Sequence, residues 1–523
     1  MAVNAPASRQ VITALRENSL GLAYFDLSEE KPDPASLNLV PGEYALKHQV
    51  IPVFLDGDVL VVAVGSVDTL SAVDDLGILL NRHVRAVLAD PNLIRDFIEE
   101  RFLNEILSNI PTDEGLGEFE DTTDLADLQK MAGETAVVQM INLIFAQAVK
   151  DGASDIHVEP YEREVKVRFR IDGMLHDMMR PPKRMQAALV SRIKILGEMN
   201  IAERRLPQDG RIKLNIAGRQ IDVRVSIVPT VYGERAVMRI LDKSTAMLGL
   251  EELGMQHDVL QKFRVVISLP YGIILATGPT GSGKSTSLYA SLQEIYSPET
   301  NILTIEDPVE YQVPGIGQIQ VRPQIGLTFA SGLRNIVRQD PDVIMVGEIR
   351  DHETAEIAIH AALTGHLVFS TLHTNDAPGA ITRLLDMGVE PYLAASSLIG
   401  VVAQRLVRRN CTNCSAPSKE PEDALRAVGI TPEDMVGKTL MRGKGCDKCQ
   451  GSGYKGRQGL YELLPIDDTI RHMTVERASS GDIKQYAVEN LGMRTLLGDG
   501  KIAVLNGKTT PEEILRVCQR EEF

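Results

Sequence analysis

The sequence contains no tryptophan, few aromatic residues (4%) and only five cysteines among 523 residues. The missing tryptophan excludes nothing, but five cysteines in so long a chain do not make a disulfide framework. No run of 18 consecutive apolar residues occurs, so we expect no transmembrane helix. The start, MAVNAPASRQ, lacks a charged-then-apolar secretory pattern, and we therefore expect a cytoplasmic protein.

The sequence also has fewer basic than acidic residues. The 55 Lys and Arg residues are outnumbered by 71 Asp and Glu, which gives a net charge of −16. This balance argues against a generic attraction to nucleic acid or anionic lipid, so we expect no nucleic-acid partner. The rest of the composition, 44% hydrophobic and 24% charged, is typical of a globular protein.

The N-terminal part of the chain is predicted to be a small α+β domain over residues 1–105. Two apolar runs flank Asp56-Gly57-Asp58, which predicts a hairpin, and residues 92–102 have helical spacing. Residues 106–130 are rich in acidic residues and Gly, and this composition favours a solvated linker.

A second small α+β domain is predicted over residues 131–245. An amphipathic pattern begins at Glu134 and predicts a helix that stops at Gly152. Alternating residues around Asp172-Gly173 predict a hairpin, and residues 219–229 alternate as a half-buried strand would.

The pattern changes in residues 246–523, where short apolar strands alternate with helical segments. Four strands are expected, at residues 272–278, 301–307, 342–348 and 366–373. Continuous apolar runs indicate strands that are buried on both faces, as in a parallel sheet with an α/β fold. Because ligands bind at the carboxyl ends of such strands, the polar stretches that follow them should gather at one edge.

The stretch GPTGSGKST lies between the first of these strands and a helical segment, and it matches G-x-x-x-x-G-K-[ST]. Its backbone N–H groups and the following helix N-terminus are suited to bind a polyphosphate, with Lys284 as a point charge and the Ser285 hydroxyl as a Mg²⁺ ligand. The predicted nucleotide-binding residues are Gly278, Pro279, Thr280, Gly281, Ser282, Gly283, Lys284, Ser285 and Thr286.

Acidic residues and histidines follow the other strands. One cluster contains Glu306, Asp307 and Glu310, and Glu348 follows a later strand, where it could touch Mg²⁺ through water. The spacing leaves open which glutamate is the base. His366 and His373 bracket the fourth strand, and we expect both at the ligand edge, where one could sense a γ-phosphate.

Two C-x-x-C pairs, separated by 31 residues, predict a structural zinc site within residues of about 405–460. Four thiolates suit tetrahedral Zn²⁺, and the surrounding sequence is basic and Gly-rich. The predicted ligands are Cys411, Cys414, Cys446 and Cys449, whereas Cys518 is expected to be a small core residue.

Several arginines are placed where a neighbouring domain or subunit could use them. Arg334 and Arg338 are expected four apart on one helix, and Arg224 and Arg239 lie on predicted strands of the second domain. Since P-loop motors commonly bring an arginine to the γ-phosphate across an interface, we expect an oligomer.

Eight motifs in order resemble those of the secretion and pilus traffic ATPases over residues of about 130–520. In the C-terminal part they are GPTGSGKSTSLYA, TIEDPVEY, LRNIVRQDPDVIMVGEIRD and ALTGHLVFSTLHTN. In the second domain they are SDIHVEP, RFRIDG, RLPQDGRI and GERAVMRIL. The resemblance implies a RecA-like P-loop motor domain with a zinc-binding tetracysteine insert, preceded by two smaller α+β domains, the second of them PAS-like.

The resemblance also implies the roles of individual residues. Glu310 would be the catalytic glutamate, Glu348 a second glutamate on the metal side, and His366 and His373 a histidine box. The arginines around the nucleotide would be Arg224, Arg239, Arg334, Arg338 and Arg457. The implied cofactors are ATP, Mg²⁺ and Zn²⁺.

The function implied by the resemblance is ATP hydrolysis by a homo-hexamer that powers pseudopilus assembly in type II secretion. The tetracysteine insert favours the assembly-type branch, which contains the type II secretion and type IV pilus extension ATPases. The single N-terminal module then favours type II secretion, with a type IV pilus extension ATPase as the alternative. A nucleic-acid translocase and a non-catalytic scaffold are weaker alternatives, because a basic strand-binding stretch is missing and both glutamates are intact. The protein would associate peripherally with the inner membrane through platform proteins, with residues 1–105 docking on a cytoplasmic domain of a membrane partner.

Overall fold

The structure, a computed structural model, describes residues 23–97 apart from short gaps, 135–216, 219–242 and 248–518. The chain falls into two compact units, one of residues 1–147 with 184–195 and the other of residues 148–183 with 196–523. The expected linker at 106–130 and most of the expected helix at 92–102 lie outside the described residues. No helix in the described ranges combines the length and apolar character needed to cross a membrane.

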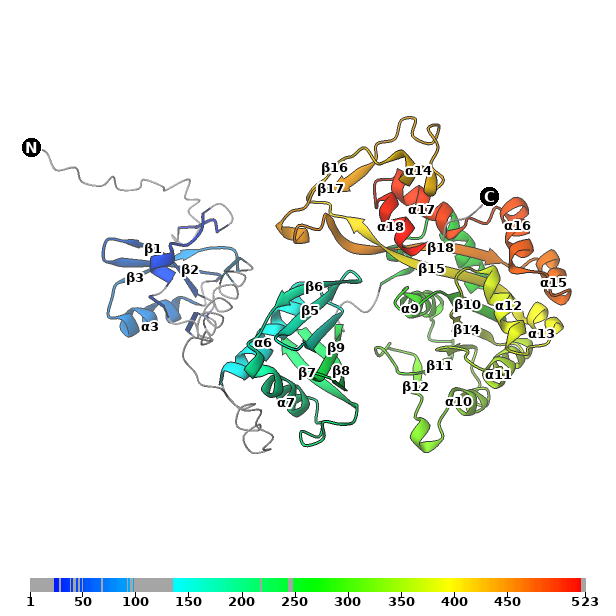
Figure 1. Cartoon of the computed structure of the whole chain (residues 1–523), viewed down its shortest axis with the longest axis horizontal. Helices are drawn as coiled ribbons and strands as arrows, with labels where there is room; N and C mark the ends of the chain where they lie inside the picture. The colour runs from blue at the N-terminus through cyan, green and yellow to red at the C-terminus, as the bar shows by residue number, and fades with distance from the viewer. Residues whose placement is uncertain are drawn as a thin grey trace, which may run out of the picture. The chain divides into compact units, whose positions relative to one another are not determined.

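A three-stranded sheet forms the core of the first unit (Figure 1). β1 (Val50–Asp56) and β2 (Val59–Val64) form the hairpin predicted at Asp56-Gly57-Asp58, and Gly57 adopts a φ of +63° in its turn. α3 (Leu70–Leu80) then connects β2 to the parallel strand β3 (Val84–Leu88). The short helix α1 (Pro34–Leu37) packs beside β1.

Two longer helices each contain a boundary between the two units, at residues 147/148 and 195/196. α6 (Thr135–Lys150) is the helix predicted from Glu134, and it ends before Gly152, whose φ is +67°. α7 (Gln186–Leu196) follows the short 3₁₀ turn η2 (Lys183–Met185).

The second unit contains a six-stranded antiparallel sheet with the order β6-β5-β4-β9-β8-β7. The Asp172-Gly173 hairpin is confirmed, with positive φ at both turn residues. β8 buries alternate residues, as its sequence predicts. The strands are β4 (Asp155–Pro160), β5 (Val165–Ile171), β6 (Met174–Met179), β7 (Gln208–Ile216), β8 (Arg219–Thr230) and β9 (Gly233–Asp242).

A seven-stranded sheet with the order β12-β11-β13-β14-β10-β15-β18 dominates the second unit. All neighbours are parallel except β15 and β18, so the expectation of a parallel sheet is confirmed. The strands are β10 (Gly272–Thr277), β11 (Ile302–Glu306), β12 (Gly317–Gln320), β13 (Val343–Val346), β14 (Leu367–Leu372), β15 (Leu398–Asn410) and β18 (Tyr454–Pro465).

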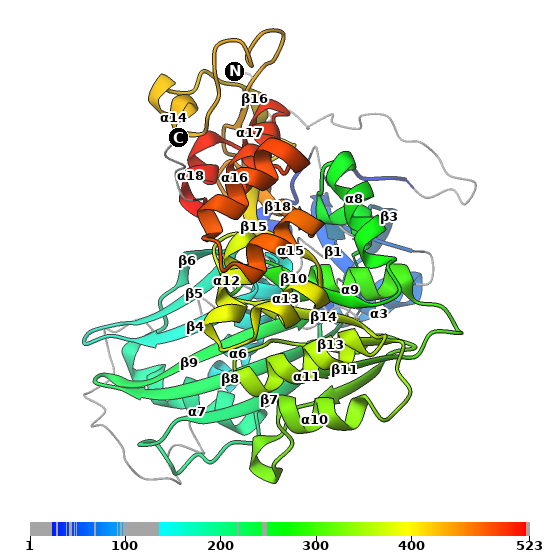
Figure 2. The ribbon, with the colours of Figure 1, turned by 90° about the vertical axis from the view of Figure 1, so that its right-hand side faces the viewer.

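Helices cover both faces of this sheet (Figure 2). Ile273 and Leu275 of β10 enter one hydrophobic core while Ile274 and Ala276 enter the other, which explains why the strand is apolar throughout. α8 (His257–Ile267) and α9 (Lys284–Ile295) pack in one core, and α10 (Phe329–Ile336), α11 (His352–Leu363), α12 (Pro378–Asp386) and α13 (Pro391–Ser397) in the other. A 3₁₀ turn, η4 (Leu250–Leu253), precedes α8, and another, η5 (Pro323–Ile325), precedes α10.

The segment between β15 and β18 is an insert, and helices follow β18. The insert contains β16 (Ser415–Pro417), α14 (Glu422–Ala427), β17 (Met441–Gly443) and η6 (Asp447–Cys449). The C-terminal helices are α15 (Asp468–Val475), α16 (Ser480–Leu491), α17 (Leu496–Leu505) and α18 (Pro511–Val517).

Candidate active site

The predicted phosphate loop connects β10 to α9, and α9 begins at Lys284. Gly278 and Gly283 have φ values of +148° and +91°. A Cβ atom at Gly283 would lie 2.7 Å from Nε2 of Gln404, and one at Gly278 would lie 2.6 Å from the Gln404 carbonyl oxygen. Both positions therefore require glycine for backbone conformation as well as for space.

Lys284 is buried inside this loop, where its Nζ donates to the carbonyl oxygens of Gly278 (2.8 Å) and Pro279 (3.1 Å). Burial lowers the pKa of Lys284 to about 8; Glu348 opposes this shift and Arg405 adds to it. The Ser282 hydroxyl is also buried and has no hydrogen-bond partner within the described structure. A buried cation and an unsatisfied hydroxyl in a loop with curled backbone fit a phosphate group.

Glu348 follows β13 at the carboxyl edge of the sheet and has only 13% of its side chain exposed. Its carboxylate contacts Arg350 at 2.5 Å and Nε2 of His373 at 3.5 Å. The neighbouring parallel strands β13 and β14 bring Glu348 and His373 together, as the sequence predicts.

The acidic cluster after β11 separates into two kinds of residue. Glu306 is buried and accepts hydrogen bonds from Tyr289 Oη, Thr304 Oγ1 (2.6 Å) and Gln318 Nε2 (3.1 Å), so its oxygens are occupied. Glu310 is about one-third exposed. Of the two glutamates in this cluster, Glu310 is therefore the one whose carboxylate is accessible to a water molecule.

Two of the predicted arginines lie opposite each other on adjacent strands: Arg224 on β8 pairs in register with Arg239 on β9. Arg224 forms an ion pair with Glu310 at 2.9 Å and donates to the Val309 carbonyl at 2.6 Å. Arg239 pairs with Asp155 at 3.0 Å. Thus the six-stranded sheet supplies an arginine that pairs with Glu310.

Arg457 on β18 lies 3.9 Å from a carboxylate oxygen of Asp172. The adjacent Gly456 amide donates to the other oxygen of the same carboxylate at 2.7 Å. Asp172 therefore holds this end of β18, and the Arg457 guanidinium, 44% exposed, stays accessible to a further partner.

Two expectations about position are wrong. His366 precedes β14 and its ring contacts the Ala361 carbonyl at 2.8 Å, so it lies at the amino end of the strand. With His373 at the carboxyl end, the two histidines lie seven residue steps, or about 23 Å, apart along the strand. Arg338 lies beyond α10, because the helix ends at Ile336 and the chain then turns toward Pro341.

Arg334 and Arg338 are both exposed. Arg334 is in α10 and pairs with Glu353 of α11. Arg338 donates to the Asn335 side chain at 2.6 Å, just before the amino end of β13. The structure does not bring either of them to Lys284.

The four predicted cysteines lie together, with their sulfur atoms within 4.8 Å of one another. Cys411 and Cys446 are 3.9 Å apart, and Cys414 and Cys449 are 3.8 Å apart. Tetrahedral zinc with Zn–S bonds of about 2.3 Å requires sulfur–sulfur distances of about 3.8 Å, so the cluster fits this metal. A hydrogen bond from Asn413 lowers the pKa of Cys446 to about 6, whereas burial raises the pKa of Cys414 to about 11, so a bound metal would have to displace the Cys414 proton.

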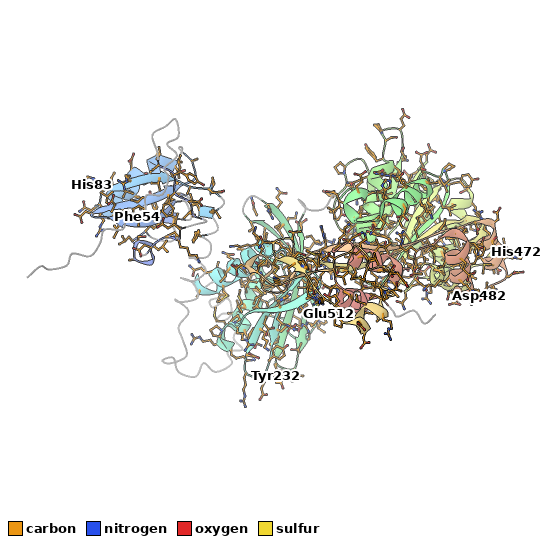
Figure 3. All side chains as sticks on the ribbon, turned by 90° about the horizontal axis from the view of Figure 1, so that it is seen from above. Phe54, His83, Tyr232, His472, Asp482 and Glu512 are labelled. Atoms are coloured by element: carbon orange, nitrogen blue, oxygen red, sulfur yellow. The ribbon has the colours of Figure 1, made fainter. Side chains whose placement is uncertain are left out.

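A salt-bridge network borders this cluster. Arg442 of β17 binds Glu420 at 2.8 Å and Glu512 of α18 at 3.2 Å; Figure 3 labels Glu512. These contacts tie the cysteine insert to a C-terminal helix.

The sequence analysis missed two polar residues beside the phosphate loop. Gln404 of β15 accepts a hydrogen bond from Ser287 at 2.8 Å, and Arg405 follows it in the same strand. Both are buried. The available signal was a Gln-Arg pair in the middle of the apolar run LIGVVAQRLV, where burial of a charge requires a special reason.

Comparison with known proteins identifies the family. A family model described as "Type II/IV secretion system protein" matches residues 130–516, and one described as "MshEN domain" matches residues 20–106. The type IV pilus assembly ATPase PilB of Myxococcus xanthus is 44% identical over 98% of this chain and 92% of its own length. The type II secretion system protein HxcR of Pseudomonas aeruginosa is 52% identical over 79% of this chain and 83% of its own.

Among solved structures, the ATPase DotB of Yersinia pseudotuberculosis superposes with a TM-score of 0.55 at 20% identity. The match covers 78% of this chain and 98% of that one, and it shows a shared fold. The chain belongs to the type II/IV secretion system protein family. It is an ATPase of that family, as the sequence motifs imply.

Proposed function

We propose that this chain is the ATP-hydrolysing motor of a machine that assembles a pilus-like fibre, and that the process it drives is type II secretion. The observation that carries the proposal is the arrangement at the carboxyl edge of the seven-stranded sheet. There Lys284 lies in the phosphate loop, Glu348 and His373 lie close together, and Glu310 contacts Arg224.

Each of these residues has a role that its environment supports. The loop from Gly278 to Thr286 holds the phosphates with its amides, while Lys284 exchanges its two carbonyl partners for phosphate oxygens. Mg²⁺, held by the Ser285 hydroxyl and through water by Glu348, would neutralise charge on the phosphates. Glu310 orients the attacking water and takes its proton.

His373 and Arg224 complete the site in this proposal. His373 is placed by its contact with Glu348 to donate toward the terminal phosphate. Arg224 leaves Glu310 for the charge that develops on the transferred phosphoryl group, and Arg239 supports it from the next strand. His366, at the far end of β14, has no such role within its own chain.

Arg334, Arg338 and Arg457 lie on exposed elements, and we propose that they serve the nucleotide of a neighbouring copy. The site would then be complete only in a ring, and we propose a homo-hexamer. The four cysteines would hold Zn²⁺ as a structural ion.

The domains of the chain would follow the division predicted from the sequence. Residues 1–105 would dock on a cytoplasmic domain of an inner-membrane platform, and residues 106–130 would link them to the rest. Residues 131–245 and 246–523 would form the two parts that share the nucleotide. The protein would then act in the cytoplasm and be held at the inner membrane by its partners.

A second candidate, the assembly of type IV pili, is favoured by one specific observation. The pilus assembly relative aligns with 98% of this chain, including the N-terminal region, whereas the type II secretion relative aligns with 79%. Deletion of the gene in its own host separates the two: loss of exported proteins with intact pili supports secretion, and the reverse supports pilus assembly.

The enzymatic part of the proposal is tested with the purified full-length chain. Lys284→Ala is expected to lower ATP turnover at least about a hundredfold, because it removes the loop's cation. Glu310→Gln is expected to lower turnover similarly while ATP binding persists, and exposed Glu299→Gln serves as the control. Near-normal turnover by Lys284→Ala would end the motor proposal.

A further inference from the structure

Arg405 is a buried cation at the border of the phosphate loop. Only 7% of the residue is exposed. It follows Gln404 in β15, the strand that pairs with β10, and its Nη1 lies 3.1 Å from where a Cβ atom on Gly278 would be. The guanidinium therefore touches the first residue of the loop that holds Lys284.

The hydrogen bonds of Arg405 all go to uncharged acceptors. Its Nη1 donates to the Gln404 carbonyl at 3.1 Å, and its Nη2 to the carbonyl (2.8 Å) and side-chain oxygen (3.3 Å) of Asn375. Its Nε donates to the Val517 carbonyl at 3.3 Å. In the part of the chain that the structure describes, no carboxylate forms an ion pair with this guanidinium.

Arg408, three residues further along the same strand, is an arginine whose charge is neutralised by a carboxylate in contact with it. It pairs with Glu513 at 2.6 Å and stacks on Tyr454 at 4.3 Å from the ring centre. The two arginines share a strand and are both largely buried, but only Arg408 has a carboxylate in contact.

The surroundings of Arg405 leave its charge uncompensated. Burial lowers the pKa of Arg405, and the charges of Cys518, Glu462 and Asp376, in that order, oppose this shift only in part. Glu462 is committed elsewhere, since its oxygens accept from the amides of Ala377 (2.8 Å) and Leu496 (3.1 Å). Lys284, a second buried cation, lies close enough for the two charges to repel each other.

A buried charge without a counter-ion is unfavourable unless a ligand supplies the opposite charge. Two buried cations beside one phosphate-binding loop share this need. A polyphosphate placed in the loop would attract both charges and relieve their repulsion.

We propose that Arg405 is a second cationic positioning residue of the nucleotide site, whose charge increases the affinity for the nucleotide's phosphates. It also ties the phosphate loop to the segment that carries His373, through Asn375, and to the end of α18, through Val517. This inference rests on the proposed nucleotide site, and it adds a residue that none of the eight motifs includes.

The competing explanation is purely structural: Arg405 would only hold three carbonyl groups together. The two explanations differ in what a lysine can replace. A lysine retains the charge but cannot reproduce the set of bonds made from Nε, Nη1 and Nη2, whereas a glutamine is neutral.

The experiment compares Arg405→Gln, Arg405→Lys and the matched control Arg408→Gln in the full-length chain. Equilibrium binding of Mg²⁺·ATP and of Mg²⁺·ADP is measured alongside thermal unfolding. Arg405→Gln is expected to weaken ATP binding about tenfold, as for one lost charge interaction of about 1.4 kcal/mol. The loss should be smaller for ADP, which carries less charge, and Arg405→Lys should bind ATP within about threefold of the native chain.

Arg408→Gln should lower the unfolding temperature and leave ATP binding unchanged. Native-like ATP binding by Arg405→Gln would overturn the proposal. Equal weakening by the lysine and glutamine variants, in parallel with lost stability, would also overturn it in favour of the structural explanation. If Arg405→Gln does not fold, the test rests on Arg405→Lys. Tenfold weaker ATP binding by a folded Arg405→Lys variant would then overturn the proposal. Failure of the native chain itself to bind ATP would instead contradict the proposed function.

Discussion

The Nε2 atom of His373 lies 3.5 Å from a carboxylate oxygen of Glu348, at the carboxyl ends of two neighbouring parallel strands. His366, which belongs to the same motif, lies at the opposite end of β14. The two histidines that flank this strand thus lie at opposite edges of the sheet, and only His373 lies at the edge from which the phosphate loop starts.

Substitution of the two histidines should therefore give different results. His373→Asn is expected to lower ATP turnover about tenfold or more, because a group beside Glu348 that can donate toward the nucleotide is lost. His366→Asn should retain most of the activity. Steady-state ATPase assays of both variants check this, and equal losses would show that His366 acts on a neighbouring copy.

Tyr289 is expected to position the loop that carries Glu310. Its hydroxyl donates to buried Glu306, which ends β11 just before that loop, and its ring packs on Tyr311 with centroids 4.5 Å apart. Loss of one hydrogen bond to a buried carboxylate in Tyr289→Phe should reduce kcat by about three- to tenfold.

The control for this prediction is Tyr311→Phe, which removes a nearby hydroxyl that is not bonded to Glu306. It should leave kcat within about twofold of the native value, and both variants should keep the native KM for ATP. If the two variants lose activity equally, the effect comes from packing of the rings rather than from the Tyr289–Glu306 bond.

Metal content provides a third prediction. The purified chain should contain one zinc ion, and Cys446→Ser should lose it, because the sulfur spacing fits a four-thiolate site. Chelation should lower the unfolding temperature, since zinc binding contributes to folding. Metal analysis of Cys518→Ser, a change outside the cluster, should show full occupancy; an unchanged metal content in Cys446→Ser would contradict the assignment.

Two buried glutamates should respond to pH in opposite directions. Burial raises the pKa of Glu462 to about 7, so the fold favours its protonated form. The stability that this group contributes is fully present below its unfolded pKa of about 4.5 and is lost as the pH rises to about 7. The stability of the Glu462→Gln variant, compared with that of the native chain, should therefore increase as the pH rises through this range.

Glu513 provides the opposite case. Burial would raise its pKa, but hydrogen bonds from Arg408 and Arg516 outweigh burial and hold it at about 2. Its contribution is present above about pH 4.5 and is lost as the pH falls toward 2. Unfolding temperatures of both glutamine variants between pH 3 and 8 check the two slopes; parallel curves would contradict the assignment.

The parts of the fold that the sequence predicts well are those with a strong local pattern. β10 and its parallel neighbours are apolar on both faces, and the two hairpins have Asp and Gly at their turns. β12 was not foreseen, because an edge strand of four mostly polar residues has no apolar pattern. β15 was missed because its apolar run contains Gln404 and Arg405.

The site was predictable where a motif is contiguous, as in the phosphate loop and the two cysteine pairs. Predictions that depend on which end of a strand a residue occupies were less reliable. His366 was misplaced because a short strand can be flanked by polar residues at both ends. The Arg224–Glu310 pairing joins residues 86 apart in the chain, and its distance cannot be read from spacing.

β15 extends from beside the phosphate loop to the cysteine cluster: Arg405 lies in its middle, and Cys411 follows its last residue, Asn410. Removal of the metal should loosen the end of β15 at Asn410, and fraying of the strand from that end would extend toward the nucleotide-binding site. By linkage, a bound nucleotide should then raise the affinity for the metal by the same factor by which the metal raises the affinity for the nucleotide. Zinc bound at the cysteine cluster would then stabilise the nucleotide-binding site from a distance. Loss of zinc would weaken nucleotide binding before the protein unfolds.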